Sequence, residues 1–282
     1  MTAAGPAVSG TAIALTIAGS DSSGGAGIQA DLKTFSAFGV YGASVITALT
    51  AQNTLGVQGI ETVSAAFVAQ QLLSVLSDLE VGAMKTGMLA NAEIVTTVAN
   101  ALRLAVPRLP LVVDPVMVAT SGDVLLAPEA VAAVKTHLLP LATLVTPNLP
   151  EAAILLGIKV ANSEDEMMSQ AKALLDSTGC RAVLIKGGHG ARGDAIDILV
   201  SAAGVEQFLR PRVATANSHG TGCTLSAAIA ALLARGVALS EAVDRAKAYV
   251  WQGLQHGRGL GIGKGRGPVD HLFAIRGMPP PA

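Results

Sequence analysis

The chain of 282 residues is long enough for one large α/β domain or two smaller ones. Hydrophobic residues make up 51% of it but aromatic residues only 3%, which favours a core of Ala, Val, Leu and Ile between helices and a parallel sheet. The 19 basic and 20 acidic residues are mixed along the chain, and this near-neutral balance argues against nucleic acid or an anionic membrane as a partner.

No apolar run reaches the roughly 18 residues that a membrane helix requires, so we expect a soluble protein. Two cysteines, Cys180 and Cys223, are too few for a disulfide framework and favour a reduced, cytoplasmic setting. Residues 1–11 carry neither a secretory nor a transit pattern and are expected to form a loose leader. No linker or repeat divides residues 12–282, which predicts a single domain.

Short apolar runs alternate with longer helical patterns along the chain. The predicted elements are, in order, a strand at 12–18, a helix at 28–38, a helix at 66–79, a strand at 83–86, a helix at 92–104, a strand at 111–114, a helix at 128–138, a strand at 143–146, a helix at 164–177, a strand at 182–186, strands at 194–200 and 205–209, and helices at 222–235 and 241–255, the last capped by Ser240.

The predicted strands are continuous apolar runs, as expected where helices cover both faces of a mostly parallel sheet. The strands at 194–200 and 205–209 are separated by a short turn and predict an antiparallel hairpin at one edge. The Gly- and Pro-rich tail at 257–282 is expected to lie over the surface. Together these features predict a three-layer α/β fold with a mostly parallel sheet between two layers of helices.

Two glycine-rich segments resemble phosphate-binding motifs but lack the required context. The run from Gly188 to Gly193 matches G-x-G-x-x-G, yet it leads into a strand instead of a helix, so a turn near a nucleotide is favoured over a dinucleotide fingerprint. Gly263 and Lys264 are followed by Gly265 where a P-loop needs Ser or Thr.

A third glycine-rich segment opens a long helix directly. The run of Gly220, Thr221, Gly222 and Cys223 can turn several N–H groups toward one point, where the helix dipole favours an anion. The same field would favour the thiolate of Cys223. Taken alone, the run fits a tight turn with a small packing residue equally well.

Polar residues at strand ends favour the anion-binding interpretation. Asp114 and Lys186 end predicted strands, and Asn148 and Glu151 follow another, so all four meet at one edge of a parallel sheet. Asp114, Glu151 and Asn148 would hold Mg²⁺, in part through water. Each also has an ordinary explanation: a turn residue for Asp114, a capping box for Asn148 and Glu151, and a surface lysine for Lys186.

These residues lie within a pattern that resembles the hydroxymethylpyrimidine/phosphomethylpyrimidine kinases of thiamine biosynthesis, in the ribokinase superfamily. The matching segments are 18–21, 24–33, 47–53, 85–89, 146–151, 186–189 and 219–224, with a weaker match at 267–271. The resemblance implies a ribokinase-like kinase domain, ATP with Mg²⁺, a homodimer, and two successive phosphorylations of one small pyrimidine.

The resemblance also implies the roles of individual residues. Gln52 would bind the aminopyrimidine, whose edge needs both a donor and an acceptor. The other implied residues are Gly19, Asp31, Met88 and Val116 around the pyrimidine; Asp114, Asn148, Lys186, Gly188 and Thr221 around the nucleotide; and Gly220, Thr221, Gly222, Cys223 and Lys186 at the transferred phosphoryl group.

Many relatives have Asp where this chain has Cys223. As a thiolate, Cys223 would be a candidate base for the first phosphorylation, whereas the second has an ionised phosphate as its nucleophile and needs no base. A pyridoxal or pyridoxine kinase on the same scaffold is the nearest alternative function. A non-catalytic nucleotide-binding module is a more remote one.

Overall fold

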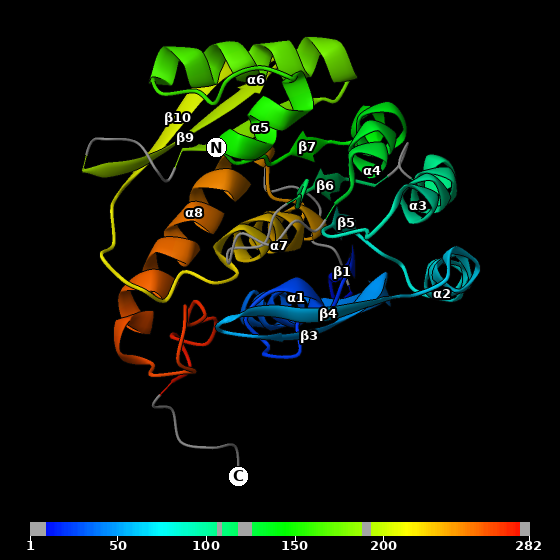
Figure 1. Cartoon of the computed structure of the whole chain (residues 1–282), viewed down its shortest axis with the longest axis horizontal. Coiled ribbons are helices and arrows are strands. Elements are labelled where there is room, and N and C mark those ends of the chain that lie inside the picture. Colours follow the sequence, from blue (N-terminus) through cyan, green and yellow to red (C-terminus); the bar gives the residue numbers. More distant parts are fainter. Residues whose placement is uncertain (1–9, 106–108, 118–125, 188–192, 277–282) are drawn as a thin grey trace.

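The computed structural model describes residues 10–105, 109–117, 126–187 and 193–276, which form two sheets and the helices around them (Figure 1). The large sheet has eight strands in the order β10-β9-β8-β7-β6-β5-β1-β2, and β3 pairs with β4 in a small antiparallel sheet. The strands are β1 Ile13–Ala18, β2 Tyr41–Ile46, β3 Ala48–Asn53, β4 Gly56–Thr62, β5 Ala83–Thr86, β6 Leu111–Val113, β7 Leu144–Val145, β8 Ala182–Gly187, β9 Asp194–Ser201 and β10 Gly204–Pro211.

The strand order explains where a ligand can bind. Strands β2, β1, β5, β6, β7 and β8 run parallel, while β9 and β10 continue the sheet as an antiparallel hairpin. From β1 the chain first adds β2 on one side and later β5 on the other, so the strand order reverses at β1. In open α/β sheets a crevice forms at the carboxyl ends of the strands beside such a point.

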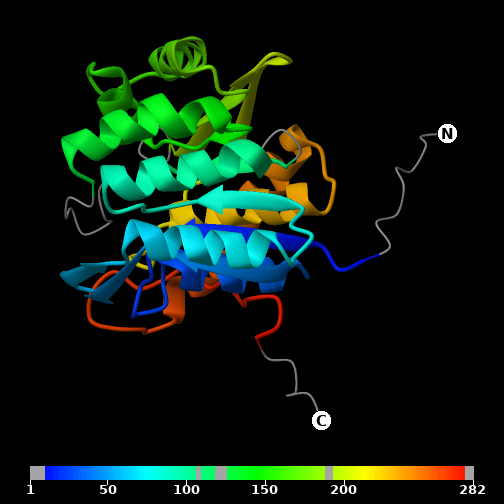
Figure 2. The same cartoon turned by 90° about the vertical axis from the view of Figure 1, so that its right-hand side faces the viewer.

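Helices cover both faces of the large sheet and give three layers. On one face lie α1 Gly27–Ala37, α7 Thr221–Ala234 and α8 Leu239–His256; on the other lie α2 Ala65–Leu76, α3 Ala92–Ala105, α4 Pro128–Ala133, α5 Leu149–Leu156 and α6 Glu164–Thr178. Figure 2 shows α2 and α3 side by side on the second face. The apolar strands supply both faces, since Leu15 and Ile17 of β1 pack under α2 and α3 while Ala14 packs toward α7.

Local sequence determines several helix ends. The Ser64 hydroxyl accepts from the Phe67 N–H at the start of α2, and Ser163 does the same for α6. The predicted cap of α8 is wrong, because that helix starts at Leu239 and the Ser240 hydroxyl donates to Glu206 instead. The predicted helix at 128–138 is also modified, since α4 passes into a π-helical turn at Val134–Leu138.

The predicted three-layer arrangement of a mostly parallel sheet between helices is confirmed, and so is the hairpin at the edge of the sheet. Sequence analysis did not predict β2, nor the small sheet of β3 and β4, whose strands lack the continuous apolar runs of the parallel strands and lie partly in solvent. It also assigned the whole tail to the surface, whereas Gly267 to His271 are buried. Among the described residues, no helix is both long and apolar enough to cross a bilayer.

Candidate active site

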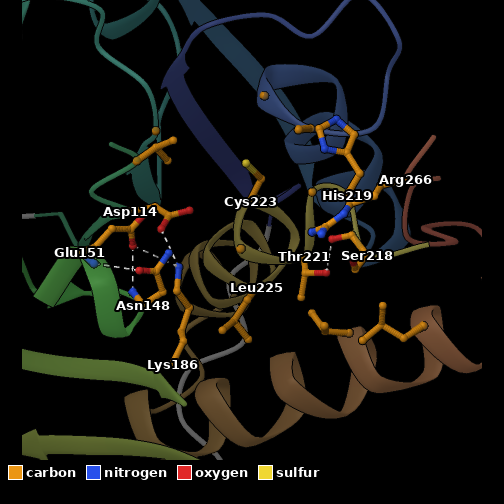
Figure 3. A pocket seen from close by; sticks show the side chains of 18 of the residues that line it. Asp114, Asn148, Glu151, Lys186, Ser218, His219, Thr221, Cys223, Leu225 and Arg266 are labelled. Atoms are coloured by element: carbon orange, nitrogen blue, oxygen red, sulfur yellow. Dashed lines mark hydrogen bonds and ion pairs between the residues drawn. The ribbon is translucent and has the colours of Figure 1, made fainter. Parts of the chain in front are cut away.

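A cavity of about 610 Å³ opens at the carboxyl ends of β1, β5, β6 and β8, where the strand order predicts a crevice. Most of the predicted site residues line it: Gly19, Gln52, Met88, Asp114, Val116, Asn148, Glu151, Lys186, Gly220, Thr221, Gly222 and Cys223. In Figure 3 the carboxylates and Lys186 gather on one side, Ser218, His219 and Thr221 lie on the other, and Cys223 lies between them.

Residues 218–223, which we call the glycine loop, form one wall of the cavity. Gly220 is the N-cap of α7 and has a φ of 78°, a left-handed conformation that favours glycine. Its carbonyl accepts the N–H of Thr224, and within the described chain the N–H groups of Gly222 and Cys223 have no backbone acceptor. These two N–H groups and the helix dipole create a site for an anion.

The loop also lies against the charged residues of the neighbouring strands. A Cβ atom added to Gly222 would be 3.2 Å from Lys186 Nζ and 3.7 Å from Asp114 Oδ2, so a side chain here would fill the space between them. Lys186 Nζ donates to Asp114 Oδ1 at 2.9 Å, and the Ser226 hydroxyl donates to Asp114 Oδ2 at 3.2 Å. An ammonium group and a helix N-terminus therefore converge on one point.

Two buried carboxylates share the positive charge of Lys186. Its Nζ lies 2.9 Å from Asp114 and 4.0 Å from Glu151. Burial raises the pKa of Glu151, Lys186 opposes this, and the nearby Asp114 raises it further, to about 7. Burial would lower the pKa of Lys186, but the two carboxylates raise it instead. The site thus has more negative charge than one ammonium neutralises.

This donor set fits Mg²⁺. Carboxylate oxygens are its preferred protein ligands, and it is commonly held by one or two of them together with water and substrate phosphates. In the described part of the chain no three His, Cys, Asp or Glu side chains cluster closely enough to hold a metal unaided. Asn148 and Glu151 also form the capping box of α5, in which Asn148 Oδ1 accepts the Glu151 N–H at 2.8 Å. Their structural and candidate metal-binding roles therefore coexist.

The other end of the cavity is formed by the segment after β1 and by β3. A Cβ on Gly19 would lie 2.7 Å from Met88 Cε, so glycine allows the Met88 side chain to approach the backbone. The register of β3 shifts between Ala51 and Gln52, a bulge of the kind that re-aims side chains. Gln52 lies at this bulge and lines the cavity.

An Asp21–His219 pair links this end to the glycine loop. His219 Nε2 lies 2.7 Å from Asp21 Oδ2, which also accepts the backbone N–H groups of Gly25 and Ala26. Burial raises the pKa of Asp21, but hydrogen bonds from His219 and Ser23 lower it to about 2, so the residue is a carboxylate. His219 Nε2 then donates to Asp21 and cannot accept from the Gln52 amide nitrogen 3.4 Å away.

Two of the sequence-based expectations need correction. Asp31 does not line the cavity: it is wholly buried, and its carboxylate pairs with Lys85 Nζ at 2.8 Å and accepts the Thr16 hydroxyl at 2.6 Å. For Cys223, burial raises the pKa of the thiol to about 11 despite the nearby Lys85, which argues against the thiolate expected from its position in the helix. Gly188, predicted at the nucleotide, lies outside the described residues.

Sequence reasoning also missed residues around the cavity. Lys247 of α8 pairs with Asp197 of β9 at 2.6 Å, and both side chains are buried in the cavity wall. Val250 and Leu254 of the same helix add apolar surface beside this pair. Val250 and Leu254 are about one turn of helix apart, and sequence analysis predicted only a helix for this segment.

Three comparisons with known proteins agree on the family. The model of the phosphomethylpyrimidine kinase family matches residues 21–270. A hydroxymethylpyrimidine/phosphomethylpyrimidine kinase of Rhizobium meliloti is 58% identical, over 93% of this chain and 97% of that protein. Among solved structures, an ADP complex of Bacillus subtilis pyridoxal kinase has a TM-score of 0.85 at 36% identity, covering 94% of this chain and 99% of that one. Phosphomethylpyrimidine kinase of Clostridium difficile 630 has a TM-score of 0.75 at 44% identity, covering 85% of this chain and 98% of that one.

Proposed function

Since the chain belongs to the phosphomethylpyrimidine kinase family, we propose that it transfers phosphoryl groups from ATP to 4-amino-5-hydroxymethyl-2-methylpyrimidine. The first transfer gives the pyrimidine monophosphate, and the second gives the diphosphate. The observation that carries this proposal is the position of Gly222, where the start of α7 meets Lys186 and Asp114 inside the cavity. An ammonium and free N–H groups at one point suit the charge that spreads over a transferring phosphoryl group.

In the first step the hydroxymethyl oxygen attacks the γ-phosphorus and loses its proton to solvent, and the bond to the oxygen that bridges the β- and γ-phosphates breaks to release ADP. In the second step an oxygen of the new phosphate attacks in the same way. Both reactions put negative charge on the same γ-phosphoryl oxygens, so the glycine loop and Lys186 serve both. Gln52 orients the aminopyrimidine through its amide, with Gly19, Met88 and Val116 beside the ring.

We propose that Asp114 and Glu151 hold the Mg²⁺ that accompanies ATP, with Asn148 positioned by the capping box. When bound, the ion neutralises charge on the nucleotide phosphates. Above the pKa of about 7, Glu151 is ionised and able to bind the cation. Before the cation binds, the Lys186 ammonium near both carboxylates limits their mutual repulsion.

The buried thiol changes the proposed role of Cys223. With a pKa of about 11, fewer than about one molecule in a thousand carries the thiolate at neutral pH. Phosphoryl transfer passes through a loose transition state that demands little from a base. We therefore assign to Cys223 its backbone N–H, as part of the anion site, and expect Cys223→Ala, which keeps this N–H, to leave both steps close to their wild-type rates. A loss confined to the first step would restore the role of general base.

The base and ribose of ATP are proposed to occupy the end of the cavity beside α8. Val250, Leu254 and Leu225 give this end an apolar wall suited to a flat heterocycle. The buried pair of Lys247 and Asp197 closes its floor. ATP bound there would point its phosphates toward the start of α7.

Product analysis tests the function. Purified protein is incubated with ATP and the hydroxymethylpyrimidine, and the pyrimidine monophosphate and diphosphate are separated and quantified with time. We expect the monophosphate to appear first and the diphosphate to follow. The same assay with pyridoxal tests the alternative that the Bacillus subtilis structure suggests. A tenfold or greater preference for pyridoxal in kcat/KM would overturn the assignment. ATP binding without any ADP release would indicate a non-catalytic module.

We also propose a homodimer and a cytoplasmic location, as the resemblance in the sequence implies. Sedimentation equilibrium tests the first proposal, and cell fractionation tests the second. The proposed single kinase domain, residues 12–282, is tested by a single cooperative unfolding transition.

A further inference from the structure

A short segment near the end of the described chain lies directly behind the glycine loop. Residues Gly267 to His271, here called the strap, are buried although their composition is that of a loop. The His219 N–H donates to the Gly267 carbonyl at 3.0 Å, and the Val269 N–H donates to the His219 carbonyl at 3.2 Å. The strap thus pairs with the backbone of the loop that forms the anion site.

Several contacts hold the strap and the residues that follow it, and most of them come from α8. The Tyr249 hydroxyl donates to the His271 carbonyl at 2.6 Å, and the Tyr249 ring packs against Phe273 with centroids 5.4 Å apart. The Asp270 N–H donates to the Gly253 carbonyl, and its carboxylate pairs with Arg276. Figure 1 shows this segment beside one end of α8. An element with these attachments can fix the position of what it contacts.

One side chain of the strap reaches the glycine loop. His271 Nε2 lies 2.9 Å from the Thr224 hydroxyl oxygen, and this hydroxyl donates to the Gly220 carbonyl at 2.8 Å. A hydroxyl has one hydrogen to donate, so His271 must be the donor to Thr224. Burial lowers the pKa of His271 to about 4, which agrees with a neutral ring that carries its proton on Nε2.

The chain of hydrogen bonds ends on the peptide that starts α7. The Gly220 carbonyl accepts both the hydroxyl and the N–H of Thr224, each at 2.8 Å. In a trans peptide the carbonyl and the next N–H point in opposite directions, so holding this carbonyl fixes the plane from which the first turn starts. The N–H groups of Gly222 and Cys223 belong to the next two peptides of the same helical turn, so their directions depend on how this first plane is held.

We propose that His271 is a positioning residue for phosphoryl transfer, acting through the Thr224 hydroxyl to hold the anion-binding N–H groups of the glycine loop in place. The inference rests on the proposed kinase function. Anion sites stabilise a transition state only when their donors are already in place, and displacement by about 1 Å can cost roughly a hundredfold in rate.

The test combines kinetics with phosphate binding. His271→Asn and Thr224→Val are compared with two controls: Thr224→Ser, which keeps the hydroxyl, and His137→Asn, which changes a histidine of the π-helical turn on the other face of the large sheet. We expect His271→Asn and Thr224→Val each to lower kcat about ten- to a hundredfold in both phosphorylations, with KM for the pyrimidine unchanged within about twofold. The double variant should lose no more than either single variant.

Binding of AMP-PCP and AMP supplies a second readout. AMP lacks the β- and γ-phosphate positions, so His271→Asn should weaken AMP-PCP at least about fivefold while AMP binding stays the same. Wild-type kcat in a folded His271→Asn variant, or multiplied losses in the double variant, would overturn the inference. If the wild type phosphorylates no pyrimidine, the proposed function fails, but the AMP-PCP to AMP ratio still tests the strap.

Discussion

A pair of glycines at the two ends of α7 offers a decisive test of the anion site. Gly220 precedes the helix with φ 78° and Gly236 follows it with φ 77°. Alanine strains either position by about 1–2 kcal/mol, because both need the left-handed conformation. Their surroundings differ, since a Cβ on Gly236 meets nothing within 4 Å, whereas one on Gly220 would lie 2.9 Å from the Gly25 carbonyl carbon and overlap its oxygen.

Both substitutions should therefore lose stability through backbone strain, and Gly220→Ala should lose more because of the overlap with Gly25. Only Gly220→Ala should lose rate. In Gly220→Ala the glycine loop and the segment at Gly25 must separate by about 1 Å, and a displacement of that size costs roughly a hundredfold in kcat. This loss corresponds to about 2.7 kcal/mol of transition-state stabilisation. Gly236→Ala should keep wild-type kcat within about twofold while it loses only the roughly 1–2 kcal/mol of backbone strain from its free energy of unfolding.

The assay measures ADP release with the hydroxymethylpyrimidine and, separately, with its monophosphate, alongside urea unfolding of both variants. We expect Gly220→Ala to be impaired in both steps, since the same N–H groups serve both. If Gly220→Ala retained a kcat within about threefold of Gly236→Ala, contact between the two loops would be irrelevant to catalysis. Equal losses of kcat in both variants would instead attribute the effect to backbone strain at the helix ends.

Three further predictions concern other parts of the cavity. Gln52→Ala should raise KM for the pyrimidine about tenfold and leave KM for ATP unchanged, through loss of a hydrogen bond to substrate; a pyrimidine KM within about twofold of wild type would contradict this. Glu151 has a folded-state pKa of about 7, above its ordinary value of 4.5, so its protonation stabilises the native state at low pH, and this contribution is lost between about pH 4.5 and 7. Urea titrations should show that Glu151→Gln loses less stability than wild type as the pH rises over that range. The same loss in both proteins would refute the raised pKa of Glu151. Lys85→Met should cost about 3–5 kcal/mol in denaturant titrations by leaving Asp31 buried and unpaired, and adding Asp31→Leu should restore most of it; equal single and double losses would count against the pair.

The sequence was most informative where parallel strands end. Asp114 and Lys186 follow apolar runs, and the geometry of a parallel sheet brings such ends to one edge whatever the details of packing. The capping residues Asn148 and Glu151 were likewise readable, because three-residue spacing before a helix is a local signal.

Other features depend on contacts between distant segments and have no local signal. Asp31 is a helix residue whose surroundings depend on which face of α1 meets β1 and β5, and there it pairs with Lys85. The high pKa of the Cys223 thiol arises from tertiary burial, whereas the helix position alone suggested a low one. His271 lies in a loop-like tail, and only its pairing with the segment around His219 buries it.

The pairing of Val269 with His219 has a consequence for how the molecule is made. The ribosome adds about 5–20 residues per second from the N-terminus, and a domain generally folds as a unit. The large sheet and α7 precede the strap in the chain, but the glycine loop obtains its backbone partners only after Gly267 and Val269 have left the ribosome. A nascent chain that already holds most of its strands therefore still lacks a braced phosphate site.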